Sequence, residues 1–277
     1  SVFMQQSGAE CEFSNSDSWV ILSPIEQSIK RKIEAVGTPL KDWDINIYRG
    51  VLIGYNEAFI ISTEKREEIL ANCQSEDERE RTAELIRPIL RGRDIKRYGY
   101  NWANLWLINT HNGIRGKLER VHIEDYPAIK AHLDQYWDRI SKRADKGDTP
   151  YNLRNCAYLD LFFQPHICWK AVGRKLAFAL VEAGTFLTAP ASFISAERYN
   201  KTVLAFLCST VGTYFVYKNS DTTGAGDIML NIQSLIKFPI PKIDLDFDNF
   251  SDREIDLYIY DIYKFTKEEI YYIEEQV

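Results

Sequence analysis

The sequence predicts a mixed α+β fold, with short curved β-sheets flanked by helices and a long helix at the C-terminus. Three observations lead to this prediction. Helix-capping signals recur along the chain, short apolar runs with the alternation of β-strands lie between them, and the repeated β-α-β pattern of a parallel sheet is absent. Together they favour a domain that mixes strands and helices over one built from repeated crossover units.

The composition is that of an ordinary globular protein. The 277 residues are 45% hydrophobic and 27% charged, which excludes global disorder. No apolar run approaches the roughly 18 residues of a membrane-spanning helix, and the N-terminus lacks the basic and apolar segments of a signal peptide. The five cysteines are scattered and include no C-x-x-C pair, so we expect free thiols and a cytoplasmic protein.

The N-terminal part is predicted to begin with a helix and continue with strands. A capping box at residues 23–26, with proline at the first helical position, predicts a helix over 24–36. Alternating apolar residues then predict a strand pair over 45–47 and 58–61, with turns between the two strands.

The middle of the chain adds two helices and a strand. A second capping box at residues 75–78 opens a short charged helix, which Pro88 must end or kink. The apolar run 105–108 is typical of a buried strand. Proline at position 127 and an apolar stripe predict a helix over 126–140.

Further along, the apolar runs 167–172 and 176–181 are separated by a glycine-containing turn and predict a β-hairpin. A long apolar helix is expected from Ser195 towards Tyr217. A third capping box at residues 251–254 and an apolar stripe then predict a final helix of roughly 26 residues. This stripe is interpreted as intramolecular packing, and a docking surface for another chain or domain is the alternative.

The charge is distributed unevenly. The formal net charge is −6, but residues 244–277 contain 11 acidic and 3 basic side chains, so residues 1–243 carry +2. Within them, residues 79–97 hold seven basic and three acidic side chains, a local charge of +4. The acidity therefore belongs to the tail, and the overall sign does not exclude a nucleic-acid partner.

Strong enzymatic signatures are absent from the sequence. It contains no phosphate-binding loop, no H-E-x-x-H zinc helix, no G-x-S-x-G nucleophile elbow and no dinucleotide-binding glycine fingerprint. It also lacks the Asn/Asp-Pro-Pro-aromatic tetrad that grips the exocyclic amine of an extruded adenine. We therefore expect no catalytic residues and no DNA methylation by this chain alone.

Two weaker patterns concern metals. The four histidines lack the spacing of metal ligands and are expected to be structural. Asp42 and Asp44 flank Trp43, and on a strand both would face one side, where they could hold Mg²⁺ in a metal-dependent nuclease. The lysine that such a centre needs does not follow Glu57, so solvated acids beside a turn are the favoured interpretation, with no metal site.

The segment 91–98 (RGRDIKRY) is the most informative polar stretch. Arginine forks bind phosphate or guanine bidentately, glycine permits close approach of the backbone, and Asp94 can hold one guanidinium in place. A solvated basic loop with an internal Arg-Asp pair is the alternative. The segment 151–155 offers amides and an arginine suited to base edges, and 222–226 offers hydroxyls and backbone amides suited to phosphate. Ordinary loops are the alternative for both segments.

Seven blocks of the sequence resemble, in order, the TaqI-like C-terminal specificity domain, over roughly residues 40–243. The blocks are 48–59 (YRGVLIGYNEAF), 86–98 (IRPILRGRDIKRY), 126–129 (YPAI), 137–147, 151–154 (YNLR), 164–169 (QPHICW) and 238–241 (FPIP). This family is the target-recognition part of adenine-N6 DNA methyltransferases and of fused Type IIG restriction-modification enzymes. It includes the methyltransferases of BREX phage-defence systems.

The resemblance implies a DNA sequence-recognition domain that binds duplex DNA and presents an adenine to a methyltransferase domain upstream in the same polypeptide. S-adenosylmethionine would bind in that missing domain, and no cofactor is expected in this chain. Residues 1–40 are then a helical segment leading from the catalytic domain, 41–243 the recognition domain and 244–277 the acidic helix. The chain is accordingly expected to be a C-terminal fragment of a restriction-modification or phage-defence enzyme, which could also cleave DNA.

The resemblance and the side-chain chemistry together suggest a set of DNA contacts. They are Arg91, Arg93, Lys96, Arg97, Asn56, Arg154, Thr222 and Thr223. The runner-up function is a protein-interaction scaffold acting through the acidic C-terminal helix, which could also mediate self-association. An autonomous metal-dependent nuclease is the third hypothesis.

Overall fold

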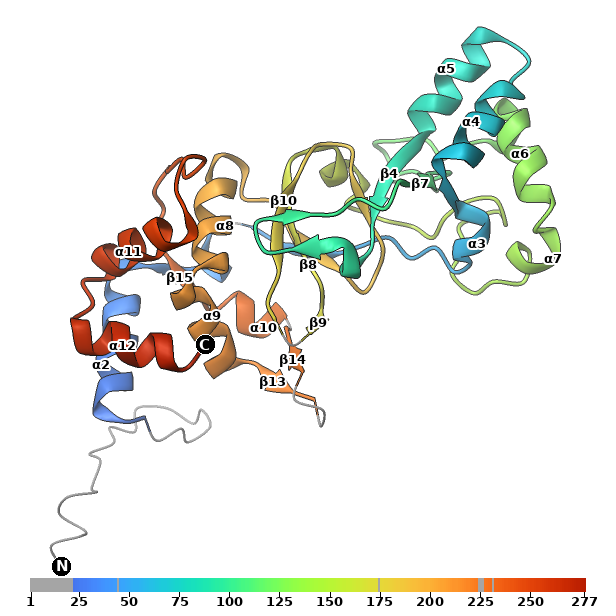
Figure 1. The fold of residues 1–277 in the computed structure, drawn as a ribbon. Helices are drawn as coiled ribbons and strands as arrows, with labels where there is room; N and C mark the ends of the chain where they lie inside the picture. Colours follow the sequence, from blue (N-terminus) through green and yellow to red (C-terminus); the bar gives the residue numbers. More distant parts are fainter. Residues whose placement is uncertain (1–21, 44, 174, 224–226, 231) are drawn as a thin grey trace, which may run out of the picture.

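The structure, a computed structural model, describes residues 22–277 except 44, 174, 224–226 and 231. Figure 1 shows an elongated molecule with α3–α7 at one end and α2, α11 and α12 at the other. Each end is organised around a hydrophobic core of its own. The first core gathers buried residues between Val51 and Phe193, and the second core joins residues near both termini, from Ile29 to Ile273.

A four-stranded antiparallel sheet separates the two cores. Its order is β10 (Phe178–Val181), β8 (His166–Trp169), β12 (Ser192–Ile194) and β2 (Ile47–Arg49). Successive side chains of a strand point to opposite faces. In β8, Cys168 therefore packs in the first core and its neighbours Ile167 and Trp169 in the second. Because both faces are covered, these strands are apolar on both sides.

A second four-stranded sheet lies inside the first core. Its order is β11 (Phe186–Leu187), β4 (Ile86–Leu90), β7 (Leu105–Ile108) and β3 (Ile60–Ser62), with β11 parallel to β4. Helices α3 (Asn56–Phe59), α4 (Thr63–Ala71), α5 (Glu76–Leu85), α6 (Pro127–Asp134) and α7 (Trp137–Ile140) accompany this sheet. The predicted strand at 105–108 and the end of α5 before Pro88 are confirmed.

Short ribbons and helices complete the molecule. The ribbons pair β1 (Thr38–Pro39) with β15 (Pro239–Ile240), β5 (Ile95–Lys96) with β6 (Gly99–Tyr100), and β14 (Ile228–Met229) with both β9 (Val172–Gly173) and β13 (Asp221–Thr222). The remaining helices are α2 (Pro24–Val36), α8 (Asn200–Cys208), α9 (Thr210–Asn219), α10 (Ile232–Leu235), α11 (Asp252–Tyr263) and α12 (Lys267–Glu275). Short 3₁₀ turns are η1 (Leu40–Asp42), η2 (Gly92–Asp94), η3 (Ile123–Asp125), η4 (Leu159–Phe163) and η5 (Glu197–Tyr199). No described helix has the length and apolarity needed to cross a bilayer.

The α+β class, the helix over 24–36 with its capping box and the hairpin of β8 with β10 are confirmed. The strand pair predicted near the N-terminus is wrong. Residues 56–59 form helix α3, and β2 and β3 belong to different sheets. Packing explains this, because Ala58 and Phe59 are fully buried on one side of that short helix.

Three helices predicted as continuous are broken by local signals. Ser209 is extended (ψ 163°) and its side chain accepts from the Gly212 amide, so α9 starts anew after α8. Lys264 adopts the left-handed conformation (φ 55°), and Thr266 with Glu269 forms a further capping box that starts α12. The helix predicted over 126–140 divides into α6 and α7.

Helices α11 and α12 pack within the molecule. Ile255, Ile259 and Ile273 lie in the second core, where α11 contacts α2 and α9 and α12 contacts α9. The carboxylate of Glu269, only 5% exposed, accepts from Lys32 Nζ at 2.6 Å and from Ser28 Oγ at 2.7 Å, which joins α12 to α2. The apolar stripe of the acidic tail therefore serves intramolecular packing.

Candidate nucleic-acid interface

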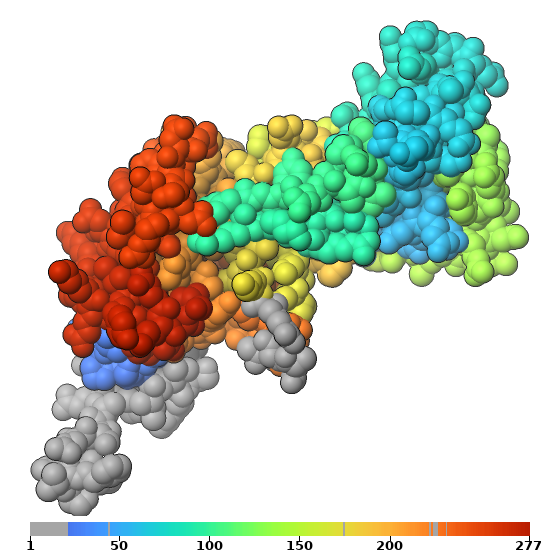
Figure 2. Space-filling view, viewed as in Figure 1, coloured from blue at the N-terminus to red at the C-terminus, as the bar shows by residue number. Residues whose placement is uncertain are grey.

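The basic segment 91–97 connects the two ends of the molecule. Strand β4 ends at Leu90, the turn η2 follows, and β5 and β6 then form a hairpin that packs on β10. Figures 1 and 2 show this hairpin, in green, reaching across the middle of the molecule towards α8 and α11. Its side chains differ sharply in what they contact.

Arg91 forms the internal pair that was the alternative interpretation of this segment. Its Nε and Nη2 donate to the two carboxylate oxygens of Asp94 at 3.0 and 2.8 Å, and its backbone amide donates to the same carboxylate. Asp94 is 5% exposed. Burial by itself would raise the pKa of Asp94, but the hydrogen bonds from Arg91 outweigh it and hold the pKa below its ordinary value. The Arg91 guanidinium therefore stabilises the turn through Asp94.

Arg97 also has protein partners, although its side chain is 43% exposed. Its Nε donates to the backbone carbonyl of Cys208 at 3.0 Å, and its Nη1 lies 3.0 Å from the carboxylate of Asp252 at the start of α11. Two of the four cations predicted in this segment thus have protein partners.

Arg93 and Lys96 remain as exposed cations. Neither forms a carboxylate ion pair within the described part of the chain, and Lys96 Nζ donates only to the Arg93 carbonyl, at 3.2 Å. Lys170, after β8, lies beside the turn η2: a Cβ on Gly92 would sit 3.2 Å from the Cβ of Lys170, whose Nζ lies next to Gly173 of β9. A larger residue than Gly92 would press on Lys170 here. We refer to Arg93, Lys96 and Lys170, which flank this turn, as the basic ridge.

Sequence reasoning missed Lys170 because nothing local marks it. It follows the apolar strand β8 as a single lysine. Only the packing of the hairpin against the sheet brings it next to the basic segment.

Asn56 and Arg154 lie at the other end of the molecule. Asn56 is the exposed first residue of α3, and Arg154 pairs with Asp145 at 2.6 Å. A Cβ on Gly54, which precedes α3, would lie 2.8 Å from the Asp145 carbonyl, so both residues belong to one region. Thr222 is in β13. Thr223 exchanges hydrogen bonds with Asp227, and residues 224–226 lie outside the described residues.

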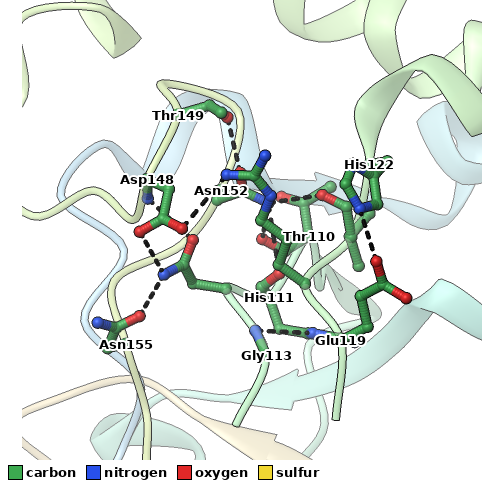
Figure 3. A network of polar contacts seen from close by, with 12 residues as sticks. Thr110, His111, Gly113, Glu119, His122, Asp148, Thr149, Asn152 and Asn155 are labelled. Atoms are coloured by element: carbon green, nitrogen blue, oxygen red, sulfur yellow. Dashed lines mark hydrogen bonds and ion pairs between the residues drawn. The ribbon is translucent and has the colours of Figure 1, made fainter. Parts of the chain in front are cut away.

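In the loop 151–155, Asn152 has a structural role. Asn152 is 1% exposed, and its amide donates to the carbonyl of Val121 at 2.9 Å and to that of His111 at 3.3 Å. Asn152 and His111 are labelled in Figure 3. Arg143 donates to the carbonyls of Asn152 (2.6 Å), Pro150 (3.1 Å) and Ile53. Burial lowers the pKa of Arg143 to about 10. These buried side chains tie the loop to the first core.

The described residues contain no group of three or more His, Cys, Asp or Glu side chains placed to hold a metal ion. Asp42 lies in the 3₁₀ turn η1, so the strand geometry of the nuclease hypothesis is wrong, and Asp44 lies outside the described residues. His132 and His166 are buried, and burial lowers the pKa of each.

Comparison with known proteins identifies the family. Two solved structures share the fold at 14% sequence identity each. The Type IIL restriction-modification enzyme MmeI, solved in complex with DNA, matches with a TM-score of 0.55 over 83% of this chain and 34% of its own. The type IIG restriction endonuclease BpuSI matches with a TM-score of 0.52 over 91% of this chain and 31% of its own.

This chain thus spans about a third of the length of each of these two enzymes. No curated protein matches the sequence. The family model described as the TaqI-like C-terminal specificity domain matches residues 87–240, more than half of the chain. The chain therefore belongs to the family of TaqI-like C-terminal specificity domains.

Proposed function

We propose that this chain is the DNA sequence-recognition domain of a restriction-modification or phage-defence adenine-N6 DNA methyltransferase. The observation that carries the proposal is the match of residues 87–240 to a specificity-domain family. The fold shared with two restriction-modification enzymes supports it. The domain would bind duplex DNA and present the target adenine to a methyltransferase domain of the same polypeptide, which would bind S-adenosylmethionine.

The geometry suggests a division of labour between the two ends of the molecule. Phosphate contacts position a protein on DNA, and contacts to base edges specify the sequence. The basic ridge of Arg93, Lys96 and Lys170 offers three cations suited to the phosphate backbone. Asn56 and Arg154, on the first core, carry side chains that read adenine and guanine edges. Asn152 and Arg143 would contribute by holding the loop of Arg154 rigid.

A titration of duplex DNA at increasing salt tests the proposal. We expect weak binding by the isolated domain, with a dissociation constant of about 10⁻⁴ to 10⁻⁶ M, and affinity that falls steeply with salt. The double variant Arg93→Ala/Lys96→Ala should weaken binding and reduce the slope of log K against log salt by about two. Fluorescence anisotropy with a labelled duplex measures both quantities.

Arg31→Ala is the matched control, because Arg31 is an exposed arginine of α2 without an ion pair among the described residues. It should change neither affinity nor slope. Binding that is independent of salt, or unaltered by the double variant, would argue against the proposal.

The two other hypotheses find less support. A scaffold acting through the C-terminal helices would need a free apolar stripe, but Ile255, Ile259 and Ile273 are at most 4% exposed. A metal-dependent nuclease at Asp42 lacks its expected strand. Deleting residues 251–277 is not a clean test of the scaffold, because it would uncover the second core.

A further inference from the structure

The turn of the basic hairpin is fastened to the second core. Lys96 pairs with Gly99, so Arg97 and Tyr98 form the turn. Tyr98 adopts the left-handed conformation (φ 63°), which is unfavourable for a residue with a Cβ and persists only where the surroundings hold it. Its backbone amide donates to the Phe178 carbonyl at 2.9 Å, and its side chain packs against the second core.

Arg97 bridges two helix ends beside this turn. Cys208 is the last residue of α8, and carbonyls in the last turn of a helix lack intrahelical donors. The Nε of Arg97 donates a hydrogen bond to one of these carbonyls, that of Cys208. Its Nη1 contacts Asp252, the first residue of α11. One turn further along α11, the buried Asp256 accepts from the amide and hydroxyl of Thr210 at 2.7 and 2.6 Å. The interruption between α8 and α9 and the first turn of α11 thus form one hydrogen-bonded frame.

We infer that Arg97 and Asp252 are positioning residues that hold the basic ridge in place, and that Arg97 itself does not contact DNA. The inference rests on the proposed function. It predicts that an acidic residue of the tail, Asp252, strengthens binding to a polyanion. Plain electrostatics predicts the reverse, because removing a negative charge next to the hairpin and releasing Arg97 for a phosphate would raise affinity.

The test compares Arg97→Lys, Arg97→Ala, Asp252→Asn and the double variant Arg97→Ala/Asp252→Asn in the anisotropy titration. Arg97→Lys keeps the positive charge but cannot bond both partners with one planar fork. We expect Arg97→Lys and Asp252→Asn each to lower affinity about twofold, as for the loss of an exposed ion pair. Their salt slopes should equal that of the unaltered protein. The double variant should bind as Arg97→Ala does, because the two residues act through one contact.

Asp261→Asn is the matched control. Asp261 is an exposed acid of the same helix without an ion pair among the described residues, and its neutralisation should not weaken binding. Higher affinity for Asp252→Asn, unaltered affinity for Arg97→Lys, or a salt slope reduced by about one in Arg97→Ala would overturn the inference.

Hydrogen exchange separates this inference from the proposed function. The Tyr98 amide should exchange faster in Arg97→Ala and Asp252→Asn and at the unaltered rate in Arg93→Ala. If the unaltered protein shows no salt-dependent DNA binding, the proposed function fails, whereas the exchange result still decides whether Arg97 and Asp252 hold the turn. If the Tyr98 amide exchanges at the unaltered rate in both variants, Arg97 and Asp252 are not positioning residues.

Discussion

Arg91 and Arg154 both pair with an aspartate close in sequence, yet the two pairs differ in burial. The Arg91–Asp94 side chains are 27% and 6% exposed and lie in the turn between the cores. The Arg154–Asp145 side chains are 55% and 33% exposed at the far end of the first core. An exposed pair exchanges its partner for a ligand at little cost, whereas a buried carboxylate cannot be left without its cation. Of these two arginines, Arg154 is therefore the easier one to release for a ligand. The pair of Arg97 with Asp252 is also exposed, at 43% and 58%, but Arg97 is held in addition by its hydrogen bond to the Cys208 carbonyl.

The largest expected change in the free energy of unfolding comes from His166, which must be separated from the Asp94 pair when stability is measured at acid pH. His166 is fully buried, and burial lowers its pKa from 6.5 to about 4. The unfolded chain then takes up the proton first, so stability should fall by about 3 kcal/mol as pH drops from about 6.5 to 4. Urea denaturation at a series of pH values measures this loss.

His166→Gln should remove most of that pH dependence, even if it lowers stability at neutral pH. The Asp94 pair acts at lower pH, because its lowered pKa makes its contribution disappear only below the ordinary value of 3.8. An unchanged pH dependence in His166→Gln would show that other groups dominate the acid transition.

Arg91→Ala tests the buried member of the comparison. It should lower the free energy of unfolding by about 2 kcal/mol, less than for a fully buried pair because the guanidinium retains some exposure. Urea denaturation at pH 7 gives the value, with Arg93→Ala as the control that should change stability by less than about 0.5 kcal/mol. Equal stability of the two variants would mean that the Asp94 pair is not structural.

Arg154→Ala tests the exposed member and should have the smallest effect on stability, about 0.5 kcal/mol or less. Its effect should appear instead in DNA binding to a recognised sequence, as a loss of about 1 kcal/mol or about fivefold in affinity. A stability loss as large as that of Arg91→Ala would remove the distinction between the two pairs.

Local signals made much of the fold predictable. The capping box of α2 forms as expected, with Ser23 and Glu26 bonding each other's backbone amides, and the apolar runs form β7, β8 and β10. The prediction of one continuous C-terminal helix was wrong, although Thr266 and Glu269 form a capping box that marks the start of a second helix. An apolar stripe continues through such an interruption, so periodicity alone hides it.

The candidate site was less predictable. The sequence located the basic segment, because charge and residue type are properties of the chain itself. Which of its cations are free depends on partners distant in sequence, such as the Cys208 carbonyl, 111 residues from Arg97.

By itself, then, the sequence determined the starts of α2, α5 and α11, the strands β7, β8 and β10, and the presence of a concentrated positive charge, since these depend on near neighbours along the chain. Only the tertiary structure decided that Asp94 is buried, that Arg97 contacts Cys208 and Asp252, and that Lys170 lies beside the turn η2. The physical reason is that burial and ion pairing arise between segments that only folding brings together.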